Sequence, residues 1–368
     1  MVTTADVLVI GGGIAGISAA ARLAPDAKVI VLERENAIGT HSTGRSAATF
    51  ILNYGNATLR ALNAASEAFL IEQEVLSKRG QLELATEAQF DDLDAYIAEC
   101  DGIERLTVAE SLALVPVLKP DQFAAGAYEP DAQDLDVDRL LQGYVRTFKQ
   151  AGGEIVTSAH VTSIKRVGNL WSLETSAGAF ETPTVVNAAG AWADEVAALA
   201  GVRRVGLVPN RRSVAILPAP EAYDVMAWPL VGSLDETWYA KPQSGKLLVS
   251  PADEDPVPPM DAWPDDMVLA EGLDRFEKAM NYSVTRVERS WAGLRSFVAD
   301  GTPVAGFAPD AEGFFWLAGQ GGYGIQTSPA LSQFAADGVL GQSSALPAEI
   351  IAKLSPGREG IGPKAALG

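Results

Sequence analysis

The feature that most constrains the fold is a glycine-rich turn near the N-terminus. Val7 to Ile10 is a short apolar run, which is typical of a buried strand in a parallel sheet. Gly11 to Gly16 follows directly with the spacing G-x-G-x-x-G, and Ile17 to Leu23 then predicts a helix. A second strand, Lys28 to Leu32, leads into Glu33. The complete unit predicts a Rossmann-type dinucleotide site and disfavours the alternative, a glycine turn in an ordinary α/β protein.

Each residue of this turn has a physical role beside a pyrophosphate. Gly11 permits the tight turn, because glycine adopts positive φ without strain. Gly13 has no side chain to block the phosphates, and Gly16 lets the helix pack closely on the strand. The backbone of Ile14 and Ala15 lies where the helix begins, so its N–H groups and partial positive charge favour an anion there.

The next residues distinguish the possible dinucleotides. Glu33 can accept hydrogen bonds from both ribose hydroxyls and would repel a 2′-phosphate, which argues against NADP. The polar loop from Gly39 to Ala48 consists mainly of small residues and contains one arginine, Arg45, which can face phosphates and a flavin edge. A plain NAD domain has no evident use for such a loop, so we predict FAD.

The segment Glu33-Arg34-Glu35, followed by HSTGRSAA at 41–48, resembles the FAD-dependent D-amino-acid oxidase superfamily. Within it, the chain is most similar to bacterial D-amino-acid dehydrogenases of the D-arginine dehydrogenase type, with glycine oxidase and monomeric sarcosine oxidase as more distant relatives. The resemblance runs over nearly the whole chain. It implies noncovalent FAD, an amino-acid substrate, and a quinone or another electron acceptor.

The resemblance also implies that separated segments hold the cofactor. We expect an α/β fold with a discontinuous Rossmann-like FAD-binding domain, 1–78, 135–208 and 292–368. A smaller α+β substrate domain with a mixed or antiparallel sheet would comprise 79–134 and 209–291, with the active site between the two. The residues expected at FAD are Gly11, Gly13, Ile14, Ala15, Gly16, Glu33, Arg34, Ser42, Thr43, Arg45, Ser46, Ala47, Ala188, Gly190, Trp192, Gly321, Gly322, Gly324, Ile325 and Gln326.

Two arginines are the expected anchors of the substrate carboxylate, because a guanidinium binds a carboxylate through two parallel hydrogen bonds. Arg212, in PNRRS, and Arg295, in WAGLRSF, match arginines with this role in the family. A solvated surface charge is the alternative for any arginine. An arginine within an apolar run such as WAGLRSF fits that alternative poorly, since burial without a partner is costly. We expect Arg211 to form a salt bridge instead.

Further site residues rest on the motif match alone. Tyr239 matches a family tyrosine that hydrogen-bonds the carboxylate, and Tyr54 matches an active-site tyrosine on a mobile loop. For an isolated tyrosine, a place in the core or at a rim is the alternative. Gly322 and Tyr323 are expected near the flavin and the substrate, and Gln326 is expected to contact one of them.

The chain departs from its near relatives at two positions. Thr49 stands where they have a histidine, and Gln81 aligns near a glutamate that favours cationic side chains in the family. A neutral glutamine would lose that charge pairing, although Glu83, on the same strand face, could substitute for it. We therefore expect a broad or apolar D-amino-acid preference.

Composition limits the partners and the compartment. The 28 Lys and Arg residues against 47 Asp and Glu give a net charge of −19, which opposes binding to nucleic acid or anionic membranes. No apolar run reaches the length of about 18 residues that a membrane helix needs. A peripheral contact with an electron carrier at the inner membrane stays open. Cys100 is the only cysteine and no signal-peptide pattern precedes Val7, which favours the cytoplasm.

Metal and triad chemistry have little support. His41 and His160 are the only histidines, and the acidic run Glu129 to Asp138 fits a polar loop better than a calcium loop. We therefore predict no metal site. His41 lies in the flavin loop and could attach flavin covalently, but the resemblance favours noncovalent binding.

Four functions are compatible with these features. The leading one is FAD-dependent oxidation of a D-amino acid to the imine, by hydride transfer from Cα to flavin N5, with hydrolysis to the 2-oxo acid and ammonia. The same fold could instead oxidise glycine, sarcosine or another secondary amine, or a 2-hydroxy acid. A non-catalytic flavoprotein is the fourth, and a pair of carboxylate-binding arginines argues against it. Among the enzymes, the resemblance favours a dehydrogenase over an oxidase.

Overall fold

The short apolar runs of the sequence form a central six-stranded sheet in the computed structural model, which describes residues 2–363. The strand order is β10-β3-β2-β14-β21-β20, and every strand is parallel to its neighbours except β20. The strands are Glu154–Val156 (β10), Val29–Leu32 (β3), Val7–Ile10 (β2), Thr184–Asn187 (β14), Phe314–Ala318 (β21) and Val304–Phe307 (β20). Layers cover both faces of this sheet, which explains the continuous apolar runs.

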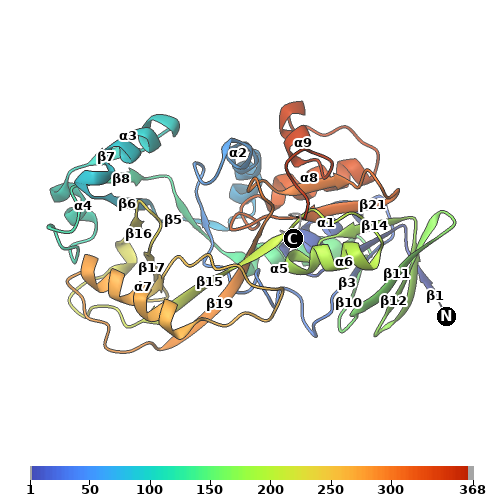
Figure 1. Cartoon of the computed structure of the whole chain (residues 1–368), viewed down its shortest axis with the longest axis horizontal. Helices are drawn as coiled ribbons and strands as arrows, with labels where there is room; N and C mark the ends of the chain where they lie inside the picture. Colours follow the sequence, from blue (N-terminus) through green and yellow to red (C-terminus); the bar gives the residue numbers. More distant parts are fainter. Residues whose placement is uncertain (1, 364–368) are drawn as a thin grey trace, which may run out of the picture.

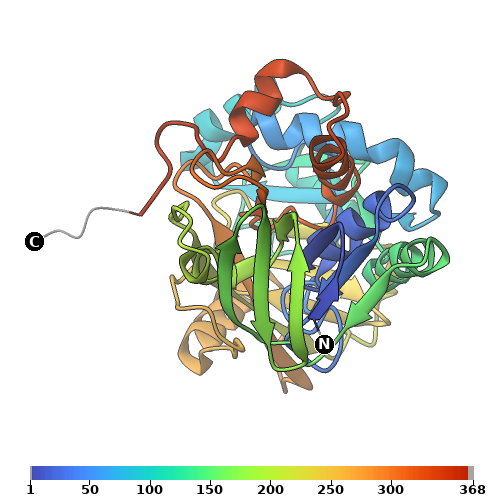
Figure 2. The same ribbon diagram turned by 90° about the vertical axis from the view of Figure 1, so that its right-hand side faces the viewer.

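Alternate side chains of the central sheet face different layers. Val9 and Val31 pack against helices on one face, whereas Leu8, Ile30 and Trp316 pack on the other against a four-stranded sheet and one helix. The first layer contains Ile14–Leu23 (α1), Ala57–Glu72 (α2), Val137–Gln150 (α5) and Ser328–Val339 (α8). The second contains Val2–Thr4 (β1), Gly178–Thr182 (β13), Leu170–Thr175 (β12), Val161–Val167 (β11) and Ala193–Leu199 (α6). Figure 2 shows this four-stranded sheet facing the viewer.

An eight-stranded mixed sheet forms the other half of the molecule (Figure 1). Its order is β19-β15-β18-β17-β16-β6-β8-β7, with a parallel pair only between β16 and β6. The strands are Arg289–Phe297 (β19), Val208–Leu217 (β15), Lys246–Ser250 (β18), Tyr239–Gln243 (β17), Leu230–Ser233 (β16), Gln81–Ala85 (β6), Ala125–Glu129 (β8) and Glu104–Leu106 (β7). Its helices are Phe90–Glu99 (α3), Val108–Leu114 (α4) and Asp266–Ala279 (α7).

Smaller elements complete the fold. A three-stranded sheet has the order β4-β9-β5, formed by Thr49–Phe50 (β4), Gln133–Leu135 (β9) and Leu76–Lys78 (β5). Three 3₁₀ turns and a last helix are Glu87–Gln89 (η1), Gly190–Trp192 (η2), Val225–Ala227 (η3) and Ala348–Leu354 (α9). Within residues 2–363, no helix combines the length and apolar character that crossing a bilayer requires.

The predicted α/β fold with a separate mixed sheet is confirmed, and local boundaries differ in two places. The sequence predicts a helical stretch from Asp274 to Tyr282. Helix α7 instead begins at Asp266, because the Asp265 side chain caps it by accepting from two backbone N–H groups. The sequence also predicts a helix from about Ile325 to Leu340, and the corresponding helix α8 begins at Ser328. Strand β19 crosses the predicted domain boundary at residue 292, so the exact division into domains stays a prediction.

Candidate active site

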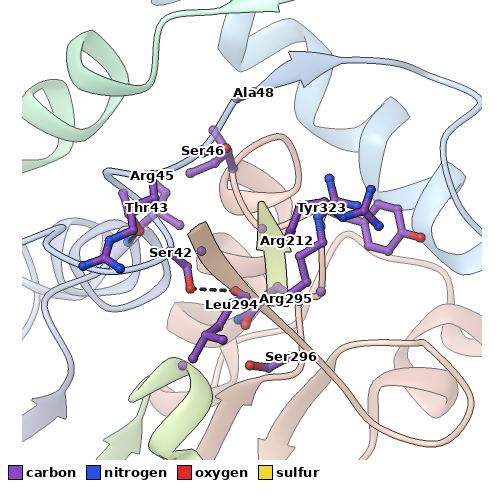
Figure 3. Close-up of a pocket in the computed structure, with 18 of the residues that line it drawn as sticks. Ser42, Thr43, Arg45, Ser46, Ala48, Arg212, Leu294, Arg295, Ser296 and Tyr323 are labelled. Atoms are coloured by element: carbon purple, nitrogen blue, oxygen red, sulfur yellow. Dashed lines mark hydrogen bonds between the residues drawn. The ribbon is translucent and has the colours of Figure 1, made fainter. Parts of the chain in front are cut away.

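One large cavity, with a volume of about 720 Å³, connects the glycine-rich turn to the eight-stranded sheet. Segments far apart in the sequence line it, within 10–15, 39–49, 188–192, 293–296 and 320–326. Figure 3 shows side chains from several of these segments around a common space. A cavity of this size suits a large organic ligand.

Some glycines of the first turn are needed for folding, and another leaves space for a ligand. Gly11 has φ +112°, and a Cβ there would lie 2.4 Å from the Ala188 carbonyl oxygen. A Cβ on Gly16 would lie 1.9 Å from the Gly11 oxygen, and Gly16 does not line the cavity. A Cβ on Gly13 would approach only Thr43 Oγ1, at 3.3 Å. Gly16 therefore serves helix packing rather than ligand contact, and Gly13 is the glycine that leaves space at the cavity.

Hydrogen bonds fix the start of the first helix beside the cavity. Thr43 Oγ1 accepts from Ile14 N at 3.0 Å. Glu33 Oε2 accepts from Gly12 N at 2.7 Å, and Glu33 Oε1 accepts from Glu35 N at 2.8 Å. The Glu33 carboxylate thus braces the turn while lining the cavity.

The expected cofactor residues beyond the first strand also reach the cavity. The Arg34 guanidinium lies over the Trp192 ring, 4.0 Å from its centroid. The other expected cofactor residues that line the cavity are Ile14, Ala15, Arg34, Ser42, Thr43, Arg45, Ser46, Ala47, Ala188, Gly190, Trp192, Gly321, Gly322, Gly324, Ile325 and Gln326.

Two of these side chains also make contacts within the protein. The Arg45 guanidinium donates to the carbonyl oxygens of Ala262 and Ala292 and pairs with Asp261, which holds it at the loop before α7. The Gln326 amide accepts from Ile51 N at 3.1 Å and donates to Asn63 Oδ1 at 2.8 Å. Its hydrogen-bonding groups are therefore engaged within the protein.

Polar groups without partners line the cavity. His41 Nδ1, Thr49 Oγ1 and Gln320 Nε2 are buried and have no hydrogen-bond partner in the described part of the chain. Buried polar atoms are normally hydrogen-bonded, so these three fit a polar ligand in the space they face. Together with the opening at Gly13 and the start of α1, they match the needs of a dinucleotide with a polar ring system.

The two predicted anchor arginines lie side by side where the eight-stranded sheet meets this cavity. Asn210 in β15 pairs with Arg295 in β19, and Arg212 pairs with Gly293, so the two arginines are diagonal neighbours on one sheet face. Figure 3 shows both side chains extending toward Tyr323. Arg212 is 7% exposed and pairs with Glu254 at 2.5 Å. Arg295 donates to the Tyr54 hydroxyl at 3.2 Å and pairs with no carboxylate within residues 2–363.

Gly322 and the predicted tyrosines surround this guanidinium. A Cβ on Gly322 would lie 3.0 Å from Arg295 Cζ, so the glycine allows the close approach. The rings of Tyr54 and Tyr323 meet edge to face with centroids 4.6 Å apart, and Tyr239 lines the cavity from the start of β17. Burial raises the pKa of Tyr323, which keeps its hydroxyl neutral. Arg211 points elsewhere and pairs with Asp255, as predicted.

The cavity continues beyond these groups to strand β6. Gln81 and Glu83 both line it, which confirms that they share a strand face, and Gln81 Nε2 donates to Glu83 Oε1. Burial raises the pKa of the Glu83 carboxyl to about 8. Tyr96 and Trp238 also line this end. The sequence offered no signal for these two residues or for Glu254, because an aromatic residue in a helix, an aromatic residue just before a strand and a carboxylate in a loop have no distinguishing pattern.

Comparison with known proteins agrees with this geometry. The family model described as FAD dependent oxidoreductase (DAO) matches residues 6–338. Glycine oxidase of Geobacillus kaustophilus is 27% identical over 362 residues, covering 90% of this chain and 92% of that protein. Human mitochondrial sarcosine dehydrogenase is 26% identical over 349 residues, covering 85% of this chain, which spans only 37% of that longer protein.

Solved structures share the fold. The crystal structure of the G. kaustophilus glycine oxidase has a TM-score of 0.85 at 24% identity, covering 97% of this chain and 99% of the other. L-proline dehydrogenase from P. horikoshii has a TM-score of 0.84 at 22% identity, with 97% and 98% covered. Iminodiacetate oxidase from Chelativorans sp. BNC1 has a TM-score of 0.82 at 23% identity, with 95% and 98% covered. At these identities the likeness concerns the fold.

Proposed function

The chain belongs to the family of FAD-dependent oxidoreductases, and from this premise we propose that it oxidises an α-amino acid at its amine-bearing carbon. The product would be an imine, which water converts to a 2-oxo acid and ammonia. We further propose a D-amino acid as the substrate. The names of the relatives support amine or amino-acid oxidation in general.

The observation that carries this proposal is the unpaired guanidinium of Arg295. It lies beside Arg212 at the cavity, and no carboxylate of residues 2–363 pairs with it. A guanidinium in such a place is suited to a ligand carboxylate, which it can bind through two hydrogen bonds. A flavoprotein that only carries electrons has no need of this group.

The chain's residues would position the substrate for the reaction. Arg295 and Tyr239 would hold the carboxylate, and Tyr54 and Tyr323 would cover it and exclude water. The dinucleotide would lie along Gly13, Glu33 and Thr43, with its ring system near Gly322. Bound FAD would supply the redox chemistry, as the acceptor of the hydride that leaves the substrate Cα.

The far end of the cavity supports a substrate that carries a side chain. Gln81, Glu83 and Trp238 line space beyond the two arginines, which glycine would leave empty. The second candidate substrate is glycine or a secondary amine such as sarcosine, which the names of the relatives favour. We propose a dehydrogenase that passes electrons to a quinone or another acceptor, working in the cytoplasm or peripherally at the inner membrane.

An anaerobic visible spectrum of the FAD-loaded protein tests the proposal. We expect D-amino acids to bleach the oxidised flavin band, and L-isomers, glycine and sarcosine to leave it. Bleaching by glycine and sarcosine alone would establish the second candidate instead. A flavin that stays oxidised with every amine would remove the amino-acid assignment.

A further inference from the structure

We propose that Glu254 is a positioning residue that sets substrate specificity, because its pairing with Arg212 restricts the site to ligands with a single carboxylate. The inference rests on the proposed function and deepens it. It assigns different roles to the two arginines: Arg295 receives the carboxylate, and Arg212 is already compensated by the protein itself.

The backbone before Glu254 is held in an unfavourable conformation. Ala252 has φ +52°, a left-handed conformation that non-glycine residues rarely adopt. Ser250 Oγ accepts from Ala252 N at 3.1 Å and donates to the Ser213 carbonyl oxygen at 2.7 Å. Such strain persists only where the surroundings determine the conformation, so this turn is firmly built.

The next residue fixes the turn to the strand that carries Arg212. Asp253 is 8% exposed, and its carboxylate accepts from Ser213 N at 2.6 Å and from Ser213 Oγ at 2.8 Å. Ser213 is the neighbour of Arg212 in β15. Asp255, on the other side of Glu254, accepts from Arg211 N through its carbonyl oxygen at 2.9 Å. Glu254 therefore meets Arg212 because both of its neighbours are hydrogen-bonded to the same strand, even though its own side chain is 50% exposed.

The charge at the substrate end follows from this contact. Arg212 and Arg295 are like charges on one sheet face and would together suit two ligand carboxylates. Glu254 cancels one of them, which leaves one positive charge for an amino acid whose amine is neutral. A second ligand carboxylate would have to displace Glu254 from Arg212 or remain without a cationic partner. Glu83, which also lines the cavity, is an acid and offers no positive charge to such a group.

The alternative is that Glu254 merely braces the loop before α7. If Glu254 only braces the loop, removing its carboxylate should lower the stability of the protein and change the affinities of all ligands equally. A specificity role predicts that removing the carboxylate tightens the binding of dicarboxylates selectively, because Arg212 becomes free. The ratio of the two affinities therefore separates the readings.

The test uses the FAD-loaded protein and follows perturbation of its visible spectrum by acetate and by malonate. In Glu254→Gln we expect malonate to bind about tenfold more tightly relative to acetate than in the wild type. Glu254→Asp retains the charge and should restore the wild-type ratio. Asp255→Asn is the matched control, because it removes the neighbouring charge that pairs with Arg211, and its ratio should change by less than about twofold.

Each outcome decides between the readings. An unchanged malonate-to-acetate ratio in Glu254→Gln, or an equal change in Asp255→Asn, would overturn the inference. Glu254→Ala provides the same comparison if the glutamine variant loses FAD. A wild-type protein that binds neither anion would instead count against the carboxylate site of the proposed function, so the two failures are distinguishable.

Discussion

At the scale of single residues, Glu83 links the chemistry of the cavity to pH. Because its pKa is about 8, the Glu83 carboxyl is largely neutral at pH 7. A neutral substrate side chain would therefore meet a neutral group at this end of the cavity. The expected broad preference is compatible with this state. A cationic ligand group would require the ionised carboxylate, and its binding would release a proton.

We therefore predict that 5-aminopentanoate binds more tightly as the pH rises from 6 to 8. Below the pKa the affinity should rise by up to about tenfold per pH unit, because ionisation of Glu83 must accompany binding of the ammonium group. The slope should vanish above about pH 8. Spectral titration of the FAD-loaded protein at several pH values measures it.

Pentanoate and Glu83→Gln are the controls for this prediction. Pentanoate carries the same carboxylate without the cation, so its affinity should not follow the ionisation of Glu83. In Glu83→Gln the slope for 5-aminopentanoate should disappear. A slope of equal size in the variant would assign the proton to another group.

The role of a single residue was predictable from the sequence where its charge conflicts with the apolar residues around it in the chain. Arg295 lies in an apolar run, and a charge in such a run needs a special partner. Glu254 lies in a loop rich in carboxylates, where nothing distinguishes it from its neighbours. Its contact with Arg212 depends on the turn at Ala252, which only the three-dimensional structure reveals.

At the scale of elements, different glycines of the β2–α1 turn serve the fold and the ligand. We predict that Gly13→Ala folds but loses FAD, since its Cβ meets little protein yet faces the cavity. Its unfolding free energy without FAD should fall by less than about 1 kcal/mol, the cost of a poorer helix cap. FAD content and thermal unfolding of the cofactor-free protein measure the two effects.

Gly11→Ala is the contrasting variant. The φ of +112° and the Ala188 oxygen at 2.4 Å from a Cβ make the change costly for the fold itself. We expect a loss of more than about 2 kcal/mol even without FAD. If Gly13→Ala keeps FAD, or destabilises the cofactor-free protein as much as Gly11→Ala, the assigned roles are wrong.

Elements were predictable where local chemistry determines them. The strand Val7–Ile10 and the helix after the glycine-rich turn occur where the sequence predicts them. The start of α7 was predicted too late, because a Pro- and Asp-rich segment hides the cap at Asp265. The orientation of Arg45 depends on Asp261, far away in the chain, and no local pattern could show it.

At the scale of the whole molecule, the cavity lies where distant parts of the chain meet. The β2–α1 turn and the segment after β14 belong to the six-stranded sheet, whereas Arg212 and Arg295 come from the eight-stranded sheet. The early glycine turn predicted the first part, and only the family resemblance joined it to the second. A ligand that fills the cavity contacts both sheets, so it should stabilise them as one unit.

FAD should accordingly raise the thermal stability of the cofactor-free protein. At a free FAD concentration about 100 times its Kd, binding to the native state alone contributes about 2.7 kcal/mol. For a chain of this length that corresponds to a rise in Tm of about 3.5 °C. NAD at the same concentration should produce a much smaller shift, because it lacks the flavin that reaches the eight-stranded sheet. Circular dichroism melting curves test this, and equal shifts with FAD and NAD would show that only the first glycine turn, and not the whole cavity, recognises the cofactor.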